Sequence, residues 1–358
     1  MKATKQLHDL GQSLWLDNIT RDILNDGTLK KYIEELSITG LTSNPTIFNH
    51  AIKNSTSYDA GIRDAMKKGL KGEQLFFSLA VEDLTMAADF FKPIHERTHG
   101  IDGWVSLEVS PLLAYDTATT TKVAKELHQE ANRPNLFIKI PGTKEGLPAI
   151  EESIFAGVPV NVTLLFSCEQ YLAAAEAYLR GIERRIEAGL SPHVSSVASV
   201  FISRWDVAVA SKVPENLVNK LGIAVGEECY KAYCALISSP RYLKVLNSGA
   251  SVQRLLMAST GTKDPKALDT LYVSGLAAPF TINTMPEKTL LAFGDHGQVT
   301  GSMAADGGDC DDTLAAFTKA GINLKELAAT LQKEGADSFV ASWNDLMKVI
   351  DSKSGSIS

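Results

Sequence analysis

The chain has 358 residues, of which 44% are hydrophobic and 22% charged, a balance typical of a folded globular protein and not of a disordered one. Its formal net charge of −7 argues against a nucleic-acid binder, because such binding depends mainly on neutralising phosphates. No run approaches the ~18 consecutive apolar residues of a membrane span, and residues 1–30 carry charges throughout, so we expect a cytoplasmic protein without a membrane partner.

Short apolar segments with polar ends recur along the chain, and each is followed by sequence of helical spacing. In chain order, strands are expected at 14–17, 38–42, 104–109, 136–140, 158–164, 194–201, 254–258 and around 281–283. Helices are expected at 28–36, over most of 51–100, at 117–131, 146–155 and 169–188, over most of 206–248, after Pro286 and from 311 to 350, with a frayed tail from Ser352.

This alternation, without a linker or a repeat of fixed period, predicts an α/β protein that folds as one (β/α)8 TIM barrel domain over residues 1–358. Extra helices are expected about 51–100, 206–248 and 311–350, and the sequence assigns them no role. In a barrel the carboxyl ends of the strands meet on one face, where barrel enzymes keep their chemistry. Polar side chains lie at or near those ends, namely Asp17, Asn44, Glu108, Lys139, Asn161, Thr163 and Ser199.

The fourth strand segment, residues 135–143, reads NLFIKIPGT and places Lys139 inside a short apolar run. Alternation along a strand points Lys139 the same way as Phe137. An ammonium there is costly unless it is paired or deprotonated, and a neutral buried amine can attack a ketone to form a Schiff base. The alternative is a lysine whose head reaches water, as expected for Lys244 on a helix. Acids and amides at neighbouring strand ends favour the Schiff base, since a solvated lysine does not need them.

Several further segments match one enzyme family in order. They read LWLDNI around Asp17, GLTSNPTIF around Asn44, SLEVSP around Glu108, NVTLLFS around Thr163 and SVFISRWD around Arg204, with ASTGTKDP and TINTMPEKTL later in the chain. Together with NLFIKIPGT they resemble the transaldolase family, whose members build such a barrel. The resemblance implies a transferase of the pentose phosphate pathway. It would pass a dihydroxyacetone unit from sedoheptulose 7-phosphate to glyceraldehyde 3-phosphate through a lysine Schiff base, giving erythrose 4-phosphate and fructose 6-phosphate.

The resemblance also implies a role for each matching residue. Lys139 is the nucleophile, and Asp17 takes the proton from the hydroxyl whose departure breaks the carbon–carbon bond. Glu108 acts through a water that Thr163 positions, protonating and dehydrating the carbinolamine. The substrate-binding residues implied are Asn44, Asn161, Ser199, Phe201, Arg204, Ser259 and Lys263. Taken one at a time, Asp17 and Asn44 could also be turn residues, and Thr163 could be an ordinary strand residue. The functional interpretation therefore depends on the whole series of matches.

The expected phosphate site departs from the family pattern at one place. Many members have an arginine after the seventh strand, where this chain has Ser259 to Lys263. Lysine supplies a positive charge but lacks the bidentate fork of arginine, so Arg204 is expected to be the stronger phosphate ligand. Sugar phosphates are therefore the expected partners. No metal or other cofactor is expected, and the chain is expected to be a monomer or a homodimer.

Three other functions remain open at this stage. His95, Glu96 and His99 match the HExxH motif of zinc metallopeptidases, although Pro93 and Gly100 leave room for little more than one helical turn there. A barrel that only binds sugar phosphates would have no reactive lysine. An aldolase of the fructose 6-phosphate type would use the same lysine but release dihydroxyacetone. The 4 cysteines lack CxxC spacing and are interpreted as small apolar fillers.

Overall fold

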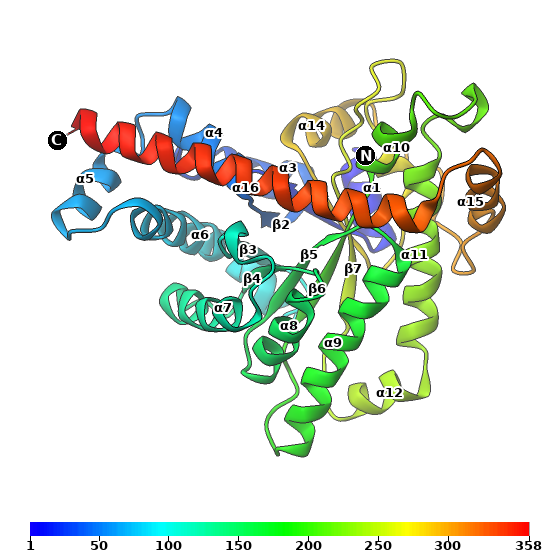
Figure 1. Cartoon of the computed structure of the whole chain (residues 1–358), viewed down its shortest axis with the longest axis horizontal. Coiled ribbons are helices and arrows are strands. Elements are labelled where there is room, and N and C mark those ends of the chain that lie inside the picture. The colour runs from blue at the N-terminus through cyan, green and yellow to red at the C-terminus, as the bar shows by residue number, and fades with distance from the viewer. Residues whose placement is uncertain (358) are drawn as a thin grey trace.

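The computed structural model describes residues 1–357, in which eight parallel strands form a closed barrel in chain order (Figure 1). The strands are β1 (Ser13–Asp17), β2 (Ile38–Thr42), β3 (Trp104–Glu108), β4 (Leu136–Pro141), β5 (Val160–Leu165), β6 (Ser196–Phe201), β7 (Gln253–Ala258) and β8 (Ile282–Met285). β8 pairs with β1 and closes the sheet. The predicted (β/α)8 barrel is confirmed, with each expected strand present within a few residues of its expected bounds.

Helices surround this barrel. The first half of the chain contributes α1 (Ala3–Leu10), α2 (Arg21–Asn25), α3 (Thr28–Leu36), α4 (Pro45–Asn54), α5 (Asp59–Lys67), α6 (Gly72–Arg97), α7 (Thr117–Ala131) and α8 (Gly146–Phe155). The second half contributes α9 (Cys168–Glu187), α10 (Ser203–Val209), α11 (Leu221–Ile237), α12 (Pro240–Asn247), α13 (Leu271–Gly275), α14 (Glu287–His296), α15 (Cys310–Lys319) and α16 (Leu324–Ile357). Short 3-10 turns, η1 (Pro111–Leu113) and η2 (Glu215–Leu217), complete the elements.

Two expectations about helix ends were wrong. Pro93 does not begin a short helix but lies inside α6, which continues because Phe91 and Ile94 are buried on either side of it. A proline near a helix end removes only one backbone hydrogen bond. The tail from Ser352 is not frayed, since α16 runs to Ile357. There Lys353 Nζ lies 3.3 Å from a carboxylate oxygen of Asp59, which ties the tail to α5.

Aromatic rings fill the barrel interior near the amino ends of the strands. The rings of Trp104 and Phe137 stack with centroids 4.0 Å apart, and the Trp15 ring lies 6.3 Å from that of Phe137. Gly40 on β2 is required there, because a Cβ at this position would lie 2.5 Å from the indole nitrogen of Trp15. These large side chains fill the end of the barrel where the strands begin. The polar residues of the strands lie at the other end.

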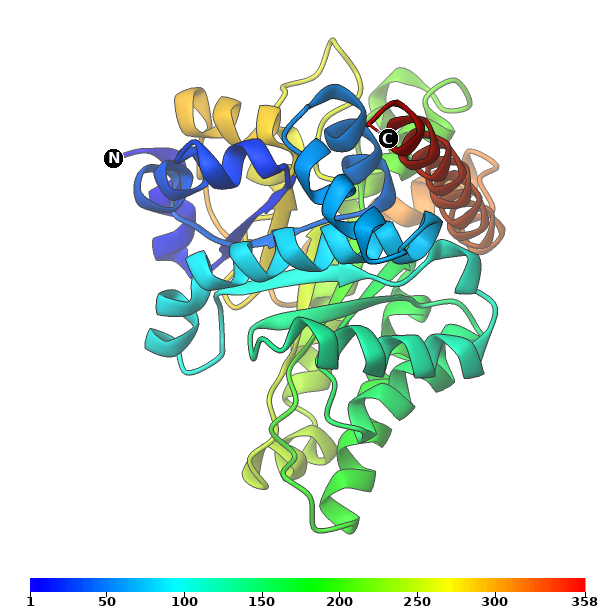
Figure 2. The ribbon, with the colours of Figure 1, turned by 90° about the vertical axis from the view of Figure 1, so that its left-hand side faces the viewer.

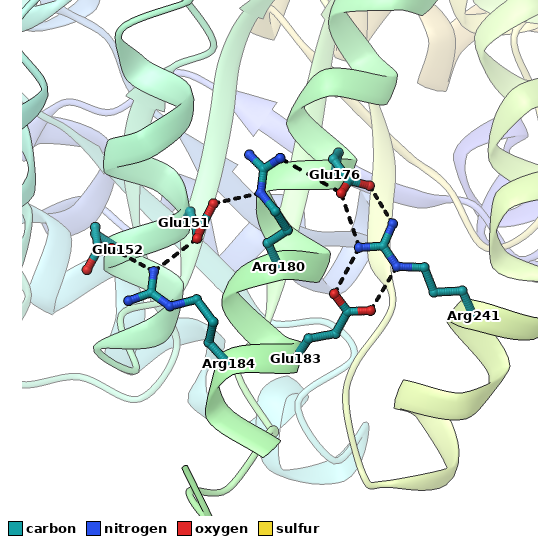
Figure 3. Close-up of polar contacts among 7 residues, drawn as sticks. All are labelled: Glu151, Glu152, Glu176, Arg180, Glu183, Arg184 and Arg241. Atoms are coloured by element: carbon teal, nitrogen blue, oxygen red, sulfur yellow. Dashed lines mark hydrogen bonds and ion pairs between the residues drawn. The ribbon is translucent and has the colours of Figure 1, made fainter. Parts of the chain in front are cut away.

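Exposed ion pairs join the helices on one side of the barrel (Figure 3). Arg241 on α12 donates to Glu176 and Glu183 on α9 at 2.6 to 3.1 Å, and Arg180 and Arg184 on α9 donate to Glu151 on α8. Single exposed ion pairs contribute little to stability, so this network mainly fixes how the three helices sit against one another.

The longest helix, α16, crosses the carboxyl ends of the strands. It is the orange-to-red helix in Figure 1 and is seen nearly along its axis in Figure 2. The side chain of Gln332 donates to the carbonyl oxygens of Gly142 (3.1 Å) and Leu164 (2.9 Å), just after β4 and near the end of β5. The final helix is therefore fastened to the two strands that carry Lys139 and Thr163.

Candidate active site

A cavity of about 230 Å³ opens at the carboxyl ends of the strands. Most of the side chains that the sequence predicted to form a site line it, namely Asp17, Asn44, Lys139, Thr163, Ser199, Phe201, Arg204, Ser259 and Lys263. Of the predicted set, only Glu108 and Asn161 do not reach the cavity wall. Residues separated by almost 250 positions in the chain are thus brought together around one amine.

Lys139 and Glu108 form a buried ion pair at this cavity. They are register partners on β4 and β3, both are 5% exposed, and Lys139 Nζ lies 3.2 Å from Glu108 Oε2. Lys139 Nζ also donates to the carbonyl oxygen of Ser43 at 3.1 Å. Neither Glu108 oxygen accepts a well-directed hydrogen bond from residues 1–357, so the contact with Lys139 is one of charge more than of hydrogen-bond geometry. Burial raises the pKa of Glu108, the charge and the close polar contact of Lys139 lower it, and the charge of Asp17 raises it.

Asp17 ends β1 and lines the same cavity. Its carboxylate accepts a hydrogen bond from Thr42 Oγ1 at 2.7 Å, and Thr42 Oγ1 lies 2.6 Å from Thr284 Oγ1. Burial raises the pKa of Asp17, and the charge of Lys139, the Thr42 hydrogen bond and the charge of Lys263 oppose that shift. Two carboxyl groups with different surroundings therefore lie near one lysine, an arrangement that lets their proton affinities differ.

Asn161 lies in a hydrogen-bonded layer inside the barrel. Its Nδ2 donates to Ser106 Oγ at 3.0 Å, and its Oδ1 accepts from Ser199 Oγ at 2.7 Å. The side chain is fully buried, so it orients Ser199 from behind the cavity wall. Thr163, two residues later on the same face of β5, does line the cavity. Its buried hydroxyl has no hydrogen-bond partner among the described residues, like the nearby carboxylate of Glu108.

Asn44 has a structural role as well as a place at the cavity. Its side-chain oxygen accepts from the backbone N–H of Ile47 at 3.0 Å and so caps α4. In the sequence Asn44 also fits a turn residue, whereas in the structure it precedes a helix whose first residue is Pro45. An amide at N-cap followed by proline at N1 is a recognisable helix start. The cap uses only the oxygen of the amide, and the amino group is left over for a ligand.

The cationic side of the cavity lies after β6 and β7. Arg204 is on α10, and its Cζ lies 5.8 Å from the Phe201 ring centroid. Lys263 follows β7, and neither cation forms a hydrogen bond or an ion pair with residues 1–357 under ordinary distance limits. Burial lowers the pKa of Arg204 while the charge of Glu334 raises it. Ser259 has a positive φ of 55° and places its hydroxyl 2.9 Å from that of Ser203. This side suits an anionic ligand.

Sequence reasoning missed several residues of the cavity. Thr42 ends an expected strand, Thr284 follows the expected eighth strand, and Phe339 lies in an expected helix, but the sequence assigns none of them a role at the site. The Phe339 ring centroid lies 5.8 Å from Lys139 Nζ, so α16 supplies a wall of the cavity beside the amine. Thr42 could have been predicted, because it ends the strand that follows the one ending at Asp17, and the two residues pair in the sheet. For Phe339 there was no such signal, because only the packing of α16 brings it there.

The HExxH residues do not form a zinc site. His95 lies in the last turn of α6, and His99 comes after the helix with a positive φ of 52°, so the two do not share one helical face. His95 Nδ1 lies 3.1 Å from the carbonyl oxygen of Asp102, near the amino ends of the strands. No three His, Cys, Asp or Glu side chains within residues 1–357 come together as metal ligands. Lys244 is exposed on α12, as expected.

Comparison with known proteins gives consistent matches over nearly the whole chain. The family model for transaldolase/fructose-6-phosphate aldolase matches residues 14–350. A transaldolase of Arthrobacter sp. (strain FB24) is 44% identical over 353 residues, covering 96% of this chain and 95% of the relative. A transaldolase of Thermobifida fusca is 42% identical over 352 residues, covering 96% of each. Transaldolase 2 of Streptomyces coelicolor is 41% identical over 355 residues, covering 97% and 95%.

Proposed function

The chain belongs to the transaldolase/fructose-6-phosphate aldolase family, and we propose that it passes a dihydroxyacetone unit from a ketose phosphate to an aldose phosphate. It is an enzyme of the transferase class. The donor and acceptor we propose are sedoheptulose 7-phosphate and glyceraldehyde 3-phosphate, as in the pentose phosphate pathway. The observation that carries this proposal is the buried amine of Lys139, which lines the cavity together with Asp17 and is paired with Glu108 just outside the cavity lining.

Schiff-base formation would use Lys139 and Glu108. The amine adds to the donor carbonyl, and the resulting carbinolamine loses water to become an iminium ion. Glu108 has two oxygens without a well-directed donor, and the Thr163 hydroxyl is likewise free, so both have capacity to bind one water between them. Through that water Glu108 would protonate the departing hydroxyl, and the raised pKa of its carboxyl suits it to hold the proton.

Carbon–carbon cleavage would use Asp17. Its carboxylate takes the proton of the donor hydroxyl, the bond to the next carbon breaks, and the electron pair moves into the iminium ion to give an enamine on Lys139. The aldose phosphate leaves, and the enamine then adds to the carbonyl of the acceptor aldose phosphate in the reverse sense. Thr42 holds the Asp17 carboxylate in place at 2.7 Å during both steps. Asn44 and Ser199, which line the cavity, would bind the hydroxyls of the donor.

The phosphate of either sugar would lie between Arg204 and Lys263. Both cations face the cavity without a carboxylate partner within ion-pair distance in residues 1–357. Arginine's fork suits phosphate, and the Ser259 hydroxyl together with the backbone of Gly261 offers further donors. Because the chain carries a net charge of −7, these local cations must outweigh a repulsive long-range field.

Three properties complete the proposal. The iminium ion acts as the electron sink, so we propose a reaction that needs no metal or other cofactor, and we expect EDTA to leave the rate unchanged. Loss of activity that zinc restores would contradict this. We propose a cytoplasmic monomer or homodimer. None of the helices in the described part of the chain has the length and apolar character needed to cross a bilayer.

The direct test is a two-substrate assay. Purified protein receives sedoheptulose 7-phosphate and glyceraldehyde 3-phosphate, and the formation of fructose 6-phosphate and erythrose 4-phosphate is followed. We expect both products in equal amounts and little free dihydroxyacetone. Release of dihydroxyacetone from fructose 6-phosphate at a comparable rate without an acceptor would instead identify an aldolase.

A further inference from the structure

A second cavity, of about 210 Å³, lies at the opposite end of the barrel, where the strands begin. We name it the Arg254 cavity after the charged side chain in its wall. Trp104 and Phe137 form its aromatic part, and the exposed imidazoles of His99 and His193 lie at its rim. β4 therefore contributes Phe137 to this cavity and Lys139 to the other one.

Arg254 is a buried cation without an acidic partner. The residue is 5% exposed, yet within residues 1–357 no carboxylate oxygen lies within the 4.0 Å of an ion pair with its guanidinium. Its Nη1 donates to the carbonyl oxygen of Ile101 at 3.0 Å, and its Nη2 donates to Ser13 Oγ at 2.7 Å and to the carbonyl oxygen of Thr281 at 2.9 Å. All three acceptors are neutral. Its Nε–H is buried and has no acceptor in the described chain.

Asp102, the nearest acidic residue, does not pair with the Arg254 guanidinium. Asp102 accepts hydrogen bonds from Ser13 Oγ, from Trp15 Nε1 at 2.9 Å and from the Gly103 N–H at 3.0 Å, so both of its oxygens are occupied. The Ser13 hydroxyl stands between Asp102 and Arg254. Burial lowers the pKa of Arg254, and the more distant charge of Asp102 only partly offsets that effect. A buried charge is stable only when it is paired, and here the pairing within the chain is incomplete.

We propose that the Arg254 cavity binds a small oxyanion, a phosphate or a carboxylate, with Arg254 as its principal ligand. An anion in the cavity would supply the negative charge that the guanidinium lacks. The imidazoles of His99 and His193 at the rim provide further donors, and the aromatic wall suits a ligand whose anionic group is carried on an apolar body. The Phe280 ring, whose centroid lies 5.5 Å from the Arg254 Cζ, extends that wall.

This site is independent of the proposed reaction, because it lies at the other end of the barrel from Lys139. The test must nevertheless exclude anions that bind between Arg204 and Lys263. The double variant Arg204→Ala, Lys263→Ala therefore serves as the parent protein. Two probes are titrated into it calorimetrically at constant ionic strength, namely inorganic phosphate and benzoate, the second being a carboxylate on an apolar ring.

Two further changes are then made in that parent. Arg254→Gln removes the charge and keeps a hydrogen-bonding side chain. Ser251→Phe adds bulk at a half-buried lining position and removes the hydroxyl that lies 3.2 Å from His193 Nδ1, but it leaves the guanidinium intact. We expect at least one probe to bind the parent and each change to weaken that binding about tenfold or more, as when one charge-assisted hydrogen bond is lost. If Arg254→Gln does not fold, as judged by circular dichroism, Ser251→Phe decides alone.

Each outcome of the calorimetric titrations either supports or contradicts the proposed anion site. Binding of either probe that falls in the folded variants supports the site, and the preferred probe shows whether the aromatic wall contributes. Failure of both probes to bind the parent, or binding that persists unchanged in the folded variants, overturns the proposal. The two-substrate assay above is unaffected by either result, so the two proposals stand or fall separately.

Discussion

Two buried ion pairs in this molecule have opposite surroundings. Outside the barrel, Arg21 on α2 donates to Asp83 on α6 at 2.8 Å, and Tyr58 donates to the other oxygen of Asp83 at 2.9 Å. Arg21 is 8% exposed and Asp83 is fully buried. Inside the barrel, Lys139 and Glu108 are equally buried, but both oxygens of Glu108 lack a well-directed donor.

The Arg21–Asp83 pair is a structural contact whose hydrogen bonds are complete. The Lys139–Glu108 pair belongs to a site with unused hydrogen-bonding capacity. At Asp83 both oxygens accept hydrogen bonds, so the pair fixes how α2 packs on α6. At Glu108 the unused lone pairs lie beside the cavity and near Asp17, a second carboxyl group whose pKa is raised. A reacting group could bind at this point. Burial and charge alone do not distinguish the two pairs. The completeness of their hydrogen bonds does.

The sharpest test of the comparison is Lys139→Met. We expect activity to fall by ~10⁴-fold or more, because no other group can form the imine. In the unaltered protein, borohydride added with fructose 6-phosphate should attach a three-carbon unit to Lys139, measured by peptide mass. Lys244→Met, at an exposed lysine, is the matched control and should keep both activity and trapping. Modification at Lys244, or at no lysine, would exclude the mechanism.

Variants of the two carboxyl groups near Lys139 should lose different steps of the reaction. Asp17→Ala should still form the Schiff base but lose carbon–carbon cleavage by ~10² to 10⁴, the range that a general base supplies. Glu108→Ala should slow formation and hydrolysis of the imine instead. Rapid-quench trapping with borohydride measures the intermediate in each variant. Accumulation of the same intermediate at the same rate in both would show that the assigned roles are wrong.

Breaking the outer pair should change stability and not chemistry. Asp83→Ala leaves the buried guanidinium of Arg21 with only Glu82 as an acidic partner, at 2.8 Å, and we expect the free energy of unfolding to fall by ~3 to 5 kcal/mol. The rate per folded molecule should stay within about twofold, since a positioned catalytic group is not involved. Urea unfolding and active-site titration by borohydride trapping measure the two quantities. A large loss of turnover without a loss of stability would contradict the division between scaffold and site.

The smallest of these effects concerns the phosphate ligands. Arg204→Ala should raise KM for fructose 6-phosphate by ~10- to 100-fold, equivalent to about 1.5 to 3 kcal/mol for a charge-assisted hydrogen bond. Lys263→Ala, at an exposed cation, should do less. Turnover of unphosphorylated fructose, however poor, serves as the control and should change little. Equal weakening of both substrates by Arg204→Ala would mean that the arginine supports the fold.

The strands were predictable from local patterns, and so were five of the cavity residues, namely Asp17, Asn44, Lys139, Thr163 and Ser199. Phe201, Arg204, Ser259 and Lys263 were expected only from the family resemblance. An apolar run that ends in a polar residue predicts both a barrel strand and the end at which it meets the cavity, as at Asp17 and Glu108. What could not be predicted depends on packing over long distances in the chain. Phe339 reaches Lys139 only through the course of α16, and Asn161 shares its strand face with Thr163 yet lies one layer deeper. Strand alternation gives the face of a residue but not its depth in the barrel.

The position of α16 at the end of the chain also bears on protein synthesis. Asp17, Asn44 and Glu108 leave the ribosome before Lys139, whereas the wall that Phe339 provides follows about 200 residues later. At ~5 to 20 residues per second, that interval lasts on the order of 10 to 40 s. During it Lys139 would lack the wall that Phe339 provides in the complete chain. Glu108 comes from β3, the strand made just before β4, so we expect the nascent lysine to have its charge partner well before it has its cover.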